Sequence, residues 1–133
     1  LPIWIGGNSD PARRRAARLG DGWHVIDVPP PDLERGIAKL AHACDEAGRD
    51  PAEVAVSMRA QLIVTKDAVP DERRLAPLVG PAAQIREDLE RLRAAGVAHL
   101  ALWPAGQGLD GAAYLERMDQ IAEEITLGLA AAR

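Results

Sequence analysis

The chain has 133 residues, 47% of them hydrophobic, which is enough for one folded domain with a buried core. Its net charge of −4, without a basic stripe interleaved with aromatic residues, argues against nucleic acid as a partner. No apolar run is long enough to cross a bilayer, so no membrane contact is expected. The single cysteine, Cys44, cannot form an internal disulfide, so we expect a cytoplasmic protein.

The first twenty-three residues predict a strand, a tight turn, a helix and the start of a second strand. An apolar run at the beginning of the chain stops at Gly6-Gly7. The cap-forming residues 8–10 then begin a helix with Pro11 in its first turn, Gly20 ends it, and a second apolar run begins at Trp23. This β–α–β unit is the one from which parallel α/β folds are built.

The diglycine turn predicts an anion-binding site. Gly6 and Gly7 have no Cβ, so an anion can come close to the main chain. The free N–H groups of the first helical turn point to the same place, and the helix dipole favours negative charge there. The side chains of Asn8 and Ser9 add hydrogen-bond donors. The residues alone also allow a simple tight turn that binds nothing.

Three further strand–helix pairs follow. Apolar runs predict strands at 23–28, within 54–64 and at 97–103, and the polar stretch 65–74 is expected to be a surface loop. Helices are expected from Asp32 to Gly48 and from Pro81 to Gly96. The polar face of the second of these helices consists of Arg86, Glu87, Asp88, Glu90, Arg91 and Arg93. The apolar stripe of a last helix consists of Leu115, Met118, Ala122, Ile125 and Leu129.

This pattern predicts an α/β fold made of four parallel β/α units joined by right-handed crossovers. Half of a (β/α)8 barrel fits the pattern, and so does a small doubly wound sheet. Periodicity does not separate the two, because both alternate the same elements along the chain.

Five stretches of the sequence resemble the C-terminal half of the luciferase-like monooxygenase superfamily, which consists of TIM-barrel oxidoreductases that use FMN or coenzyme F420. The stretches are PIWIGGNS (2–9), RRAARLGDGW (14–23), AGRDP (47–51), LVGP with QI (78–85) and AGVAHL (95–100). The resemblance covers nearly the whole chain. It implies that residues 1–133 form strands five to eight of a (β/α)8 TIM barrel.

The resemblance implies an F420- or FMN-dependent oxidoreductase or monooxygenase that transfers hydride or activates oxygen at the (deaza)flavin ring. It places the phosphate of the cofactor at the turn formed by Gly6, Gly7, Asn8 and Ser9. The proton-transfer residues proposed in the deazaflavin members come mostly from early strands that this chain lacks, so no catalytic residue is assigned. We therefore expect a homo-oligomer or association with the missing N-terminal half. The alternative is a non-catalytic half-barrel or phosphate-binding module that associates with a partner half.

Four residues near the carboxyl ends of the predicted strands are candidate substrate contacts, because barrel active sites lie at that end. His24 can hydrogen-bond a substrate or donate a proton, and Asp27 lies further toward the same rim. Arg59 needs an anionic partner, either a ligand or a carboxylate of the barrel, and Trp103 can wall the flavin pocket. For His24, Asp27 and Trp103, a structural role in packing or in a turn remains open. Trp4 is expected in the core.

No cluster of histidine, cysteine and aspartate at metal-ligand spacing occurs, so we expect no metal site. Cys44 lies on the apolar stripe of its predicted helix and is expected to pack rather than react. We expect His42 on a helix surface and His99 at the end of the sheet opposite the active site, and neither is expected to be catalytic.

Overall fold

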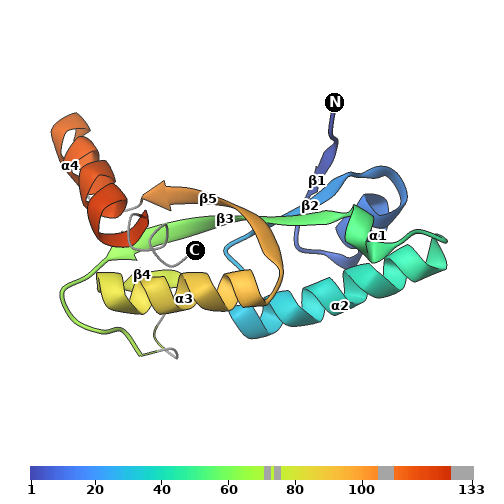
Figure 1. Ribbon diagram of the computed structural model, residues 1–133, viewed down its shortest axis with the longest axis horizontal. Helices are drawn as coiled ribbons and strands as arrows, with labels where there is room; N and C mark the ends of the chain where they lie inside the picture. Colours follow the sequence, from blue (N-terminus) through green and yellow to red (C-terminus); the bar gives the residue numbers. More distant parts are fainter. Residues whose placement is uncertain (71–72, 74–75, 105–109, 127–133) are drawn as a thin grey trace.

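The computed structural model of the chain describes residues 1–70, 73, 76–104 and 110–126. Within them the elements follow in the order β1 (Trp4–Gly6), α1 (Asp10–Leu19), β2 (Gly22–Ile26), α2 (Pro30–Glu46), η1 (Pro51–Glu53), β3 (Ala55–Val64), β4 (Leu78–Gly80), α3 (Ala82–Ala94), β5 (Val97–Pro104), α4 (Gly111–Ile121) and η3 (Ala122–Thr126). Figure 1 shows the long strand β3 at the centre of the sheet.

All strand pairs of the sheet are parallel. β2 pairs with the first half of β3, β1 lies beyond β2, and β5 pairs with β3 over most of its length. The four predicted strands and the helices between them are therefore confirmed. The strands β1, β2, β3 and β5 place their carboxyl ends along one edge of the sheet, where the candidate residues were expected.

A fifth strand, β4, was not expected. It pairs only three residues with the end of β3, from Leu62 with Leu78 to Val64 with Gly80. The side-chain amide of Gln84 donates to the carbonyl of Val69 at 2.8 Å and accepts from its N–H at 3.0 Å, which ties the preceding segment to α3. β4 lies between Pro77 and Pro81, so no longer apolar run marked these three residues as a strand.

Helices pack on one face of the sheet. α2 and α3 run alongside β3 in Figure 1, and the alternate strand residues that point toward the helices are buried. The core on this face includes Ala16, Ala17, Trp23, Val25, Leu33, Leu40, Cys44, Met58, Leu62, Ile85 and Leu92. The predicted helices 32–48 and 81–96 correspond to α2 and α3, and their apolar stripes supply much of the core.

The other face of the sheet is largely uncovered in the described part of the chain, and we call it the open face. Trp4, Ile26 and Trp103 lie on it and are 41%, 40% and 50% exposed. Trp4 was expected in the core but lies across Gly22, where a Cβ would come within 2.2 Å of its ring. A parallel sheet with helices on one face only is half of a (β/α)8 barrel, whereas a doubly wound sheet is covered on both faces.

The apolar stripe expected for the last helix is only partly packed. Leu115 and Met118 are 66% and 42% exposed, whereas Ile125 is buried. α4 projects away from α2 and α3 in Figure 1, so its first turns pack little against the helical layer. Leu129 lies outside the described residues.

The polar face expected for α3 is also partly wrong. Asp88 is only 2% exposed, and its carboxylate forms an ion pair with Arg91 at 3.3 Å. A buried carboxylate needs such partners because the loss of hydration is costly. Helical periodicity places Asp88 next to the apolar stripe, but only the packed structure shows that it is covered.

Candidate functional site

The diglycine turn joins β1 to α1 and is attached to β2. Gly7 adopts a φ of +123°, which favours glycine. Its N–H donates to the carbonyl of His24 at 3.0 Å, and its carbonyl accepts from the indole N–H of Trp23 at 2.8 Å. A Cβ on Gly6 would meet no atom within 4 Å, whereas one on Gly7 would lie 3.2 Å from the Cβ of Ala12. Space is therefore available above Gly6.

The amides that follow the turn are unpaired. Among the described residues, none accepts a hydrogen bond from the backbone N–H of Asn8, Ser9 or Asp10. The side chain of Ser9 makes no cap bond to the helix, although its carbonyl accepts from Ala12 and Arg13. Unpaired amides at the positive end of a helix dipole form a site that can bind an anion.

The side chain of Asn8 is engaged with the end of β2. Its Nδ2 donates to the carbonyl of Ile26 at 2.8 Å, and its Oδ1 accepts from the N–H of Ile26 at 3.0 Å. β1 pairs with β2 only as far as His24. Asn8 thus supplies the hydrogen-bond partners of the backbone of Ile26, which lies beyond that point. The backbone amide of Asn8, rather than its side chain, is the group left for a ligand.

We expect Asn8→Asp to lower the thermal unfolding midpoint of the complete gene product by about 2–4 °C, the shift that about 1 kcal/mol causes in a protein of roughly 150–250 residues. Aspartate keeps the acceptor for the N–H of Ile26 but sets a carboxylate oxygen against its carbonyl. Circular dichroism measures the midpoint. The exposed substitution Asp45→Asn serves as the control and should have little effect. An unchanged midpoint for Asn8→Asp would show that these bonds contribute no stability.

Two cations beside the turn were not singled out from the sequence. Arg13 donates through Nη1 to the carbonyl of Asn8 at 2.8 Å and pairs with Asp10, and Lys39 approaches Asp10 at 3.3 Å. Hydrogen bonds from Arg13 and Lys39 lower the pKa of Asp10, which favours its charged form. The positive charges of the two side chains offset this negative charge at the start of α1. The side chain of Arg13 is only 11% exposed, and Lys39 lies 29 positions from Asp10 in the sequence. The adjoining groove of about 460 Å³ is lined by residues that include Asn8, Arg13, Trp23, Asp27, Arg35 and Lys39.

Three of the four predicted substrate contacts form one cluster, which lies at the carboxyl ends of β2 and β5 and beside the middle of β3. Arg59 donates through Nη2 to Oδ2 of Asp27 at 3.0 Å. The backbone N–H of Gln61 donates to Oδ1 of the same carboxylate at 2.6 Å. The guanidinium carbon of Arg59 lies 4.5 Å from the centre of the Trp103 ring. Asp27 is thus the barrel carboxylate that could satisfy Arg59, and contact of these residues with substrate stays a prediction.

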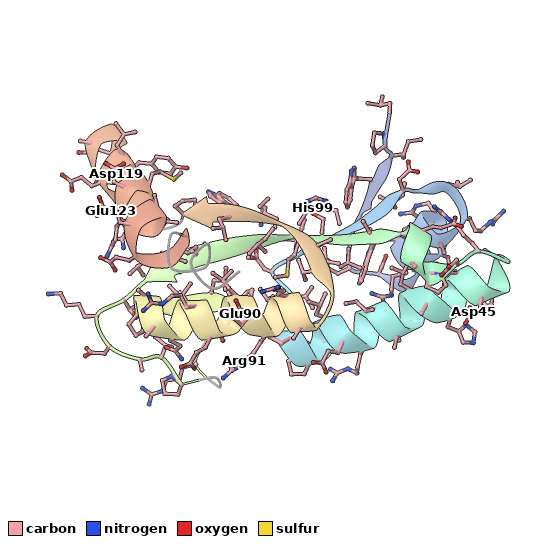
Figure 2. The ribbon with its side chains drawn as sticks, in the orientation of Figure 1. Asp45, Glu90, Arg91, His99, Asp119 and Glu123 are labelled. Carbon is pink, nitrogen blue, oxygen red and sulfur yellow. The ribbon has the colours of Figure 1, made fainter. Side chains whose placement is uncertain are left out.

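His24 lies deeper on the open face, two residues before Ile26. Its Nδ1 is 2.9 Å from Oγ of Ser57, which was not singled out, although the alternation of polar residues along β3 was visible in the sequence. Gly6 and Ser57 are the register partners of His24, and Ser57 pairs in turn with His99. His99, labelled in Figure 2, meets the ring of Trp4 edge-on at 5.6 Å.

The remaining titratable candidates give no sign of a second site. Cys44 is fully buried, and burial raises the pKa of its thiol. His42 lies near Glu46 on the surface of α2. Within the residues described, no group of three metal-ligating side chains comes together. None of the described helices combines the length and hydropathy needed to cross a membrane.

A one-sided parallel sheet with its candidate site at the carboxyl ends of the strands is the arrangement of (β/α)8-barrel enzymes. The family of luciferase-like monooxygenases matches residues 1–130, and the chain belongs to this family.

The chain is also similar in sequence to one relative and in fold to solved structures. An uncharacterised protein of Mycobacterium tuberculosis is 44% identical over 57 residues, which cover 42% of this chain and 19% of that protein. The F420-dependent tetrahydromethanopterin reductase of Methanopyrus kandleri has a TM-score of 0.72 at 15% identity, covering 94% of this chain and 50% of that one. A type II Baeyer–Villiger monooxygenase of Pseudomonas putida, solved with FMN, has a TM-score of 0.58 at 18% identity, covering 93% and 48%. The chain thus spans about half the length of these two solved proteins.

Proposed function

We propose that the chain is the C-terminal half of the barrel of an F420- or FMN-dependent oxidoreductase, and that it binds the cofactor phosphate at the diglycine turn. One observation carries this proposal. The unpaired amides of Asn8, Ser9 and Asp10 lie directly after a turn with open space above Gly6. Membership of the luciferase-like family and solved relatives described as F420-dependent or bound to FMN support the choice of ligand.

The residues of this chain would then bind and orient the reactants. The amides at the start of α1 hold the phosphate, and Arg13 and Lys39 add positive charge beside it. His24 can exchange a proton with substrate, since Ser57 bonds one ring nitrogen and no described residue bonds the other. The cofactor, when bound, supplies the hydride transfer or oxygen activation.

The open face also bears on the partner of this chain. It carries exposed apolar side chains, Trp4 and Ile26 among them, beside polar ones. We propose that four further β/α units cover it, either from the N-terminal half of the same protein or from an associated chain. The second candidate function, a non-catalytic half-barrel that associates with a partner half, is favoured by the same exposed surface.

Titration of F420 and of FMN, followed by cofactor fluorescence, tests the proposal on the complete gene product and separately on residues 1–133. We expect tight binding of one cofactor by the complete protein and binding weaker by about a hundredfold or more by the segment, which lacks half of the barrel wall. If the complete protein binds neither cofactor, the enzyme is excluded and the non-catalytic half-barrel stands.

A further inference from the structure

Arg59 is the only charged residue in the described strands β1 to β5. It points to the open face, and its side chain is 34% exposed. A cation within a sheet is costly unless it is paired, and an arginine kept at such a position needs a physical reason. The neighbours of Arg59 supply part of that reason.

Two side chains hold the guanidinium of Arg59 in place. Asp27 accepts from Nη2 through one carboxylate oxygen at 3.0 Å, while its other oxygen accepts from the N–H of Gln61 at 2.6 Å. One oxygen of Asp27 thus accepts from Arg59 and the other accepts from the backbone of β3, so the ion pair has a single hydrogen bond rather than two. Trp103 stacks against the guanidinium at 4.5 Å, as expected for a cation–π contact.

This arrangement leaves most donors of the guanidinium unused. A guanidinium has five N–H donors, and Asp27 is the only acceptor recorded for Arg59 among the described residues. Its Nε is buried and unpaired in that part of the chain. An unmade bond to a buried donor costs free energy. The hydrogen bond with Asp27 therefore positions the guanidinium but leaves its other N–H groups without acceptors in the described residues.

The charge of the cluster selects the ligand. Arg59 and Asp27 together are neutral, so a monoanion gains hydrogen bonds from Arg59 while facing a single carboxylate. For a phosphate dianion the attraction to Arg59 and the repulsion from Asp27 both double, so the neutral pair does not offset the larger desolvation cost of the dianion. The planar edge of a guanidinium suits the two oxygens of a carboxylate.

We propose that Arg59 binds the carboxylate of a small organic acid, with Asp27 and Trp103 as positioning residues, and that such acids are the substrate class of this site. The inference rests on the proposed function for the role of the acid as substrate. Ser57 and Arg59 are two residues apart on one face of β3, about 7 Å along the strand. An acid held by Arg59 would therefore extend over the pair of His24 and Ser57.

Binding of benzoate, benzamide and phenyl phosphate to the complete gene product, measured by isothermal titration calorimetry, tests this proposal. Benzoate and benzamide share a shape and differ in charge. We expect benzoate to bind more tightly than either of the other two, by about tenfold over benzamide. Equal binding of benzoate and benzamide, tighter binding of phenyl phosphate, or no binding of benzoate would overturn the proposal.

Three variants locate the effect. Arg59→Gln should abolish the preference for benzoate over benzamide, whereas Arg14→Gln, an exposed arginine of α1, should preserve it. Trp103→Leu replaces a half-exposed side chain, so the fold should tolerate it, and it should weaken benzoate binding severalfold. A preference that survives Arg59→Gln, or benzoate binding unaffected by Trp103→Leu, contradicts the assignment. Thermal unfolding of each variant checks its fold.

Cofactor titration of the same samples separates this proposal from the proposed function. Arg59→Gln should bind F420 or FMN as the unsubstituted protein does, because the phosphate site lies at the start of α1. A preference for benzoate in a protein that binds neither cofactor would support the acid site and exclude the oxidoreductase. Cofactor binding without that preference would retain the oxidoreductase and exclude the acid site.

Discussion

Gly6→Asp is expected to weaken cofactor binding by the complete gene product about a hundredfold, which corresponds to about 2.7 kcal/mol. A Cβ at Gly6 meets no atom within 4 Å, so the backbone can accept a side chain there. The new carboxylate would lie beside the amides that we assign to the phosphate. Two unit charges 4 Å apart repel by about 4 kcal/mol at the effective dielectric near a protein surface. Fluorescence titration with F420 or FMN measures the affinity.

Gly6→Asn is the matched control for this prediction. Asparagine has nearly the same size and shape as aspartate but no charge, so it separates repulsion from simple obstruction of the turn. We expect Gly6→Asn to lower the affinity much less than Gly6→Asp does. Equal affinities of the two variants would remove the electrostatic basis for an anion site at this turn.

Trp23→Ala is expected to reduce the free energy of unfolding by about 3–5 kcal/mol, the usual cost of removing a large aromatic side chain from a core. Trp23 is 1% exposed and packs so closely on α2 that a Cβ on Gly36 would lie 2.8 Å from its ring. Its indole N–H also donates to the carbonyl of Gly7 at 2.8 Å. The same side chain thus fills the core and attaches the diglycine turn to β2.

Urea unfolding, followed by circular dichroism, measures this loss. Trp23→Phe keeps most of the buried surface but cannot donate to Gly7, so we expect a smaller loss of stability together with weaker cofactor binding. Leu19→Ala, at a position that is 67% exposed, should change stability by less than about 0.5 kcal/mol. A loss below about 1 kcal/mol for Trp23→Ala would contradict the packing described for this tryptophan.

The sequence predicted the elements that depend on neighbouring residues. The helix after the diglycine turn begins at Asp10 and ends at Leu19, as the cap residues and Gly20 indicated. The third strand lies within the predicted range and runs to Val64. Caps, turns and apolar periods act over a few residues, so a single sequence displays them. The family resemblance likewise agreed with the match over residues 1–130.

The arrangement of the candidate site depended on contacts between residues far apart in the chain. Asp27 and Arg59 are 32 positions apart, and His24 and Ser57 are 33 apart. Nothing in the local pattern of either segment specifies its partner, because strand register is set by the packing of the whole sheet. Each candidate could therefore be named from the sequence, but its partner could not.

The sequence by itself determined the order of the helices and of every strand except β4, the diglycine turn and the residues that can carry chemistry, because these follow from local backbone and side-chain preferences. Only the tertiary structure decided that helices cover one face of the sheet, that Trp4 lies on the open face and that Arg59 is held by Asp27 and Trp103. The physical reason is that burial and pairing depend on the summed packing of distant segments. Helical and strand periods show which residues share a face, but they do not show what that face meets.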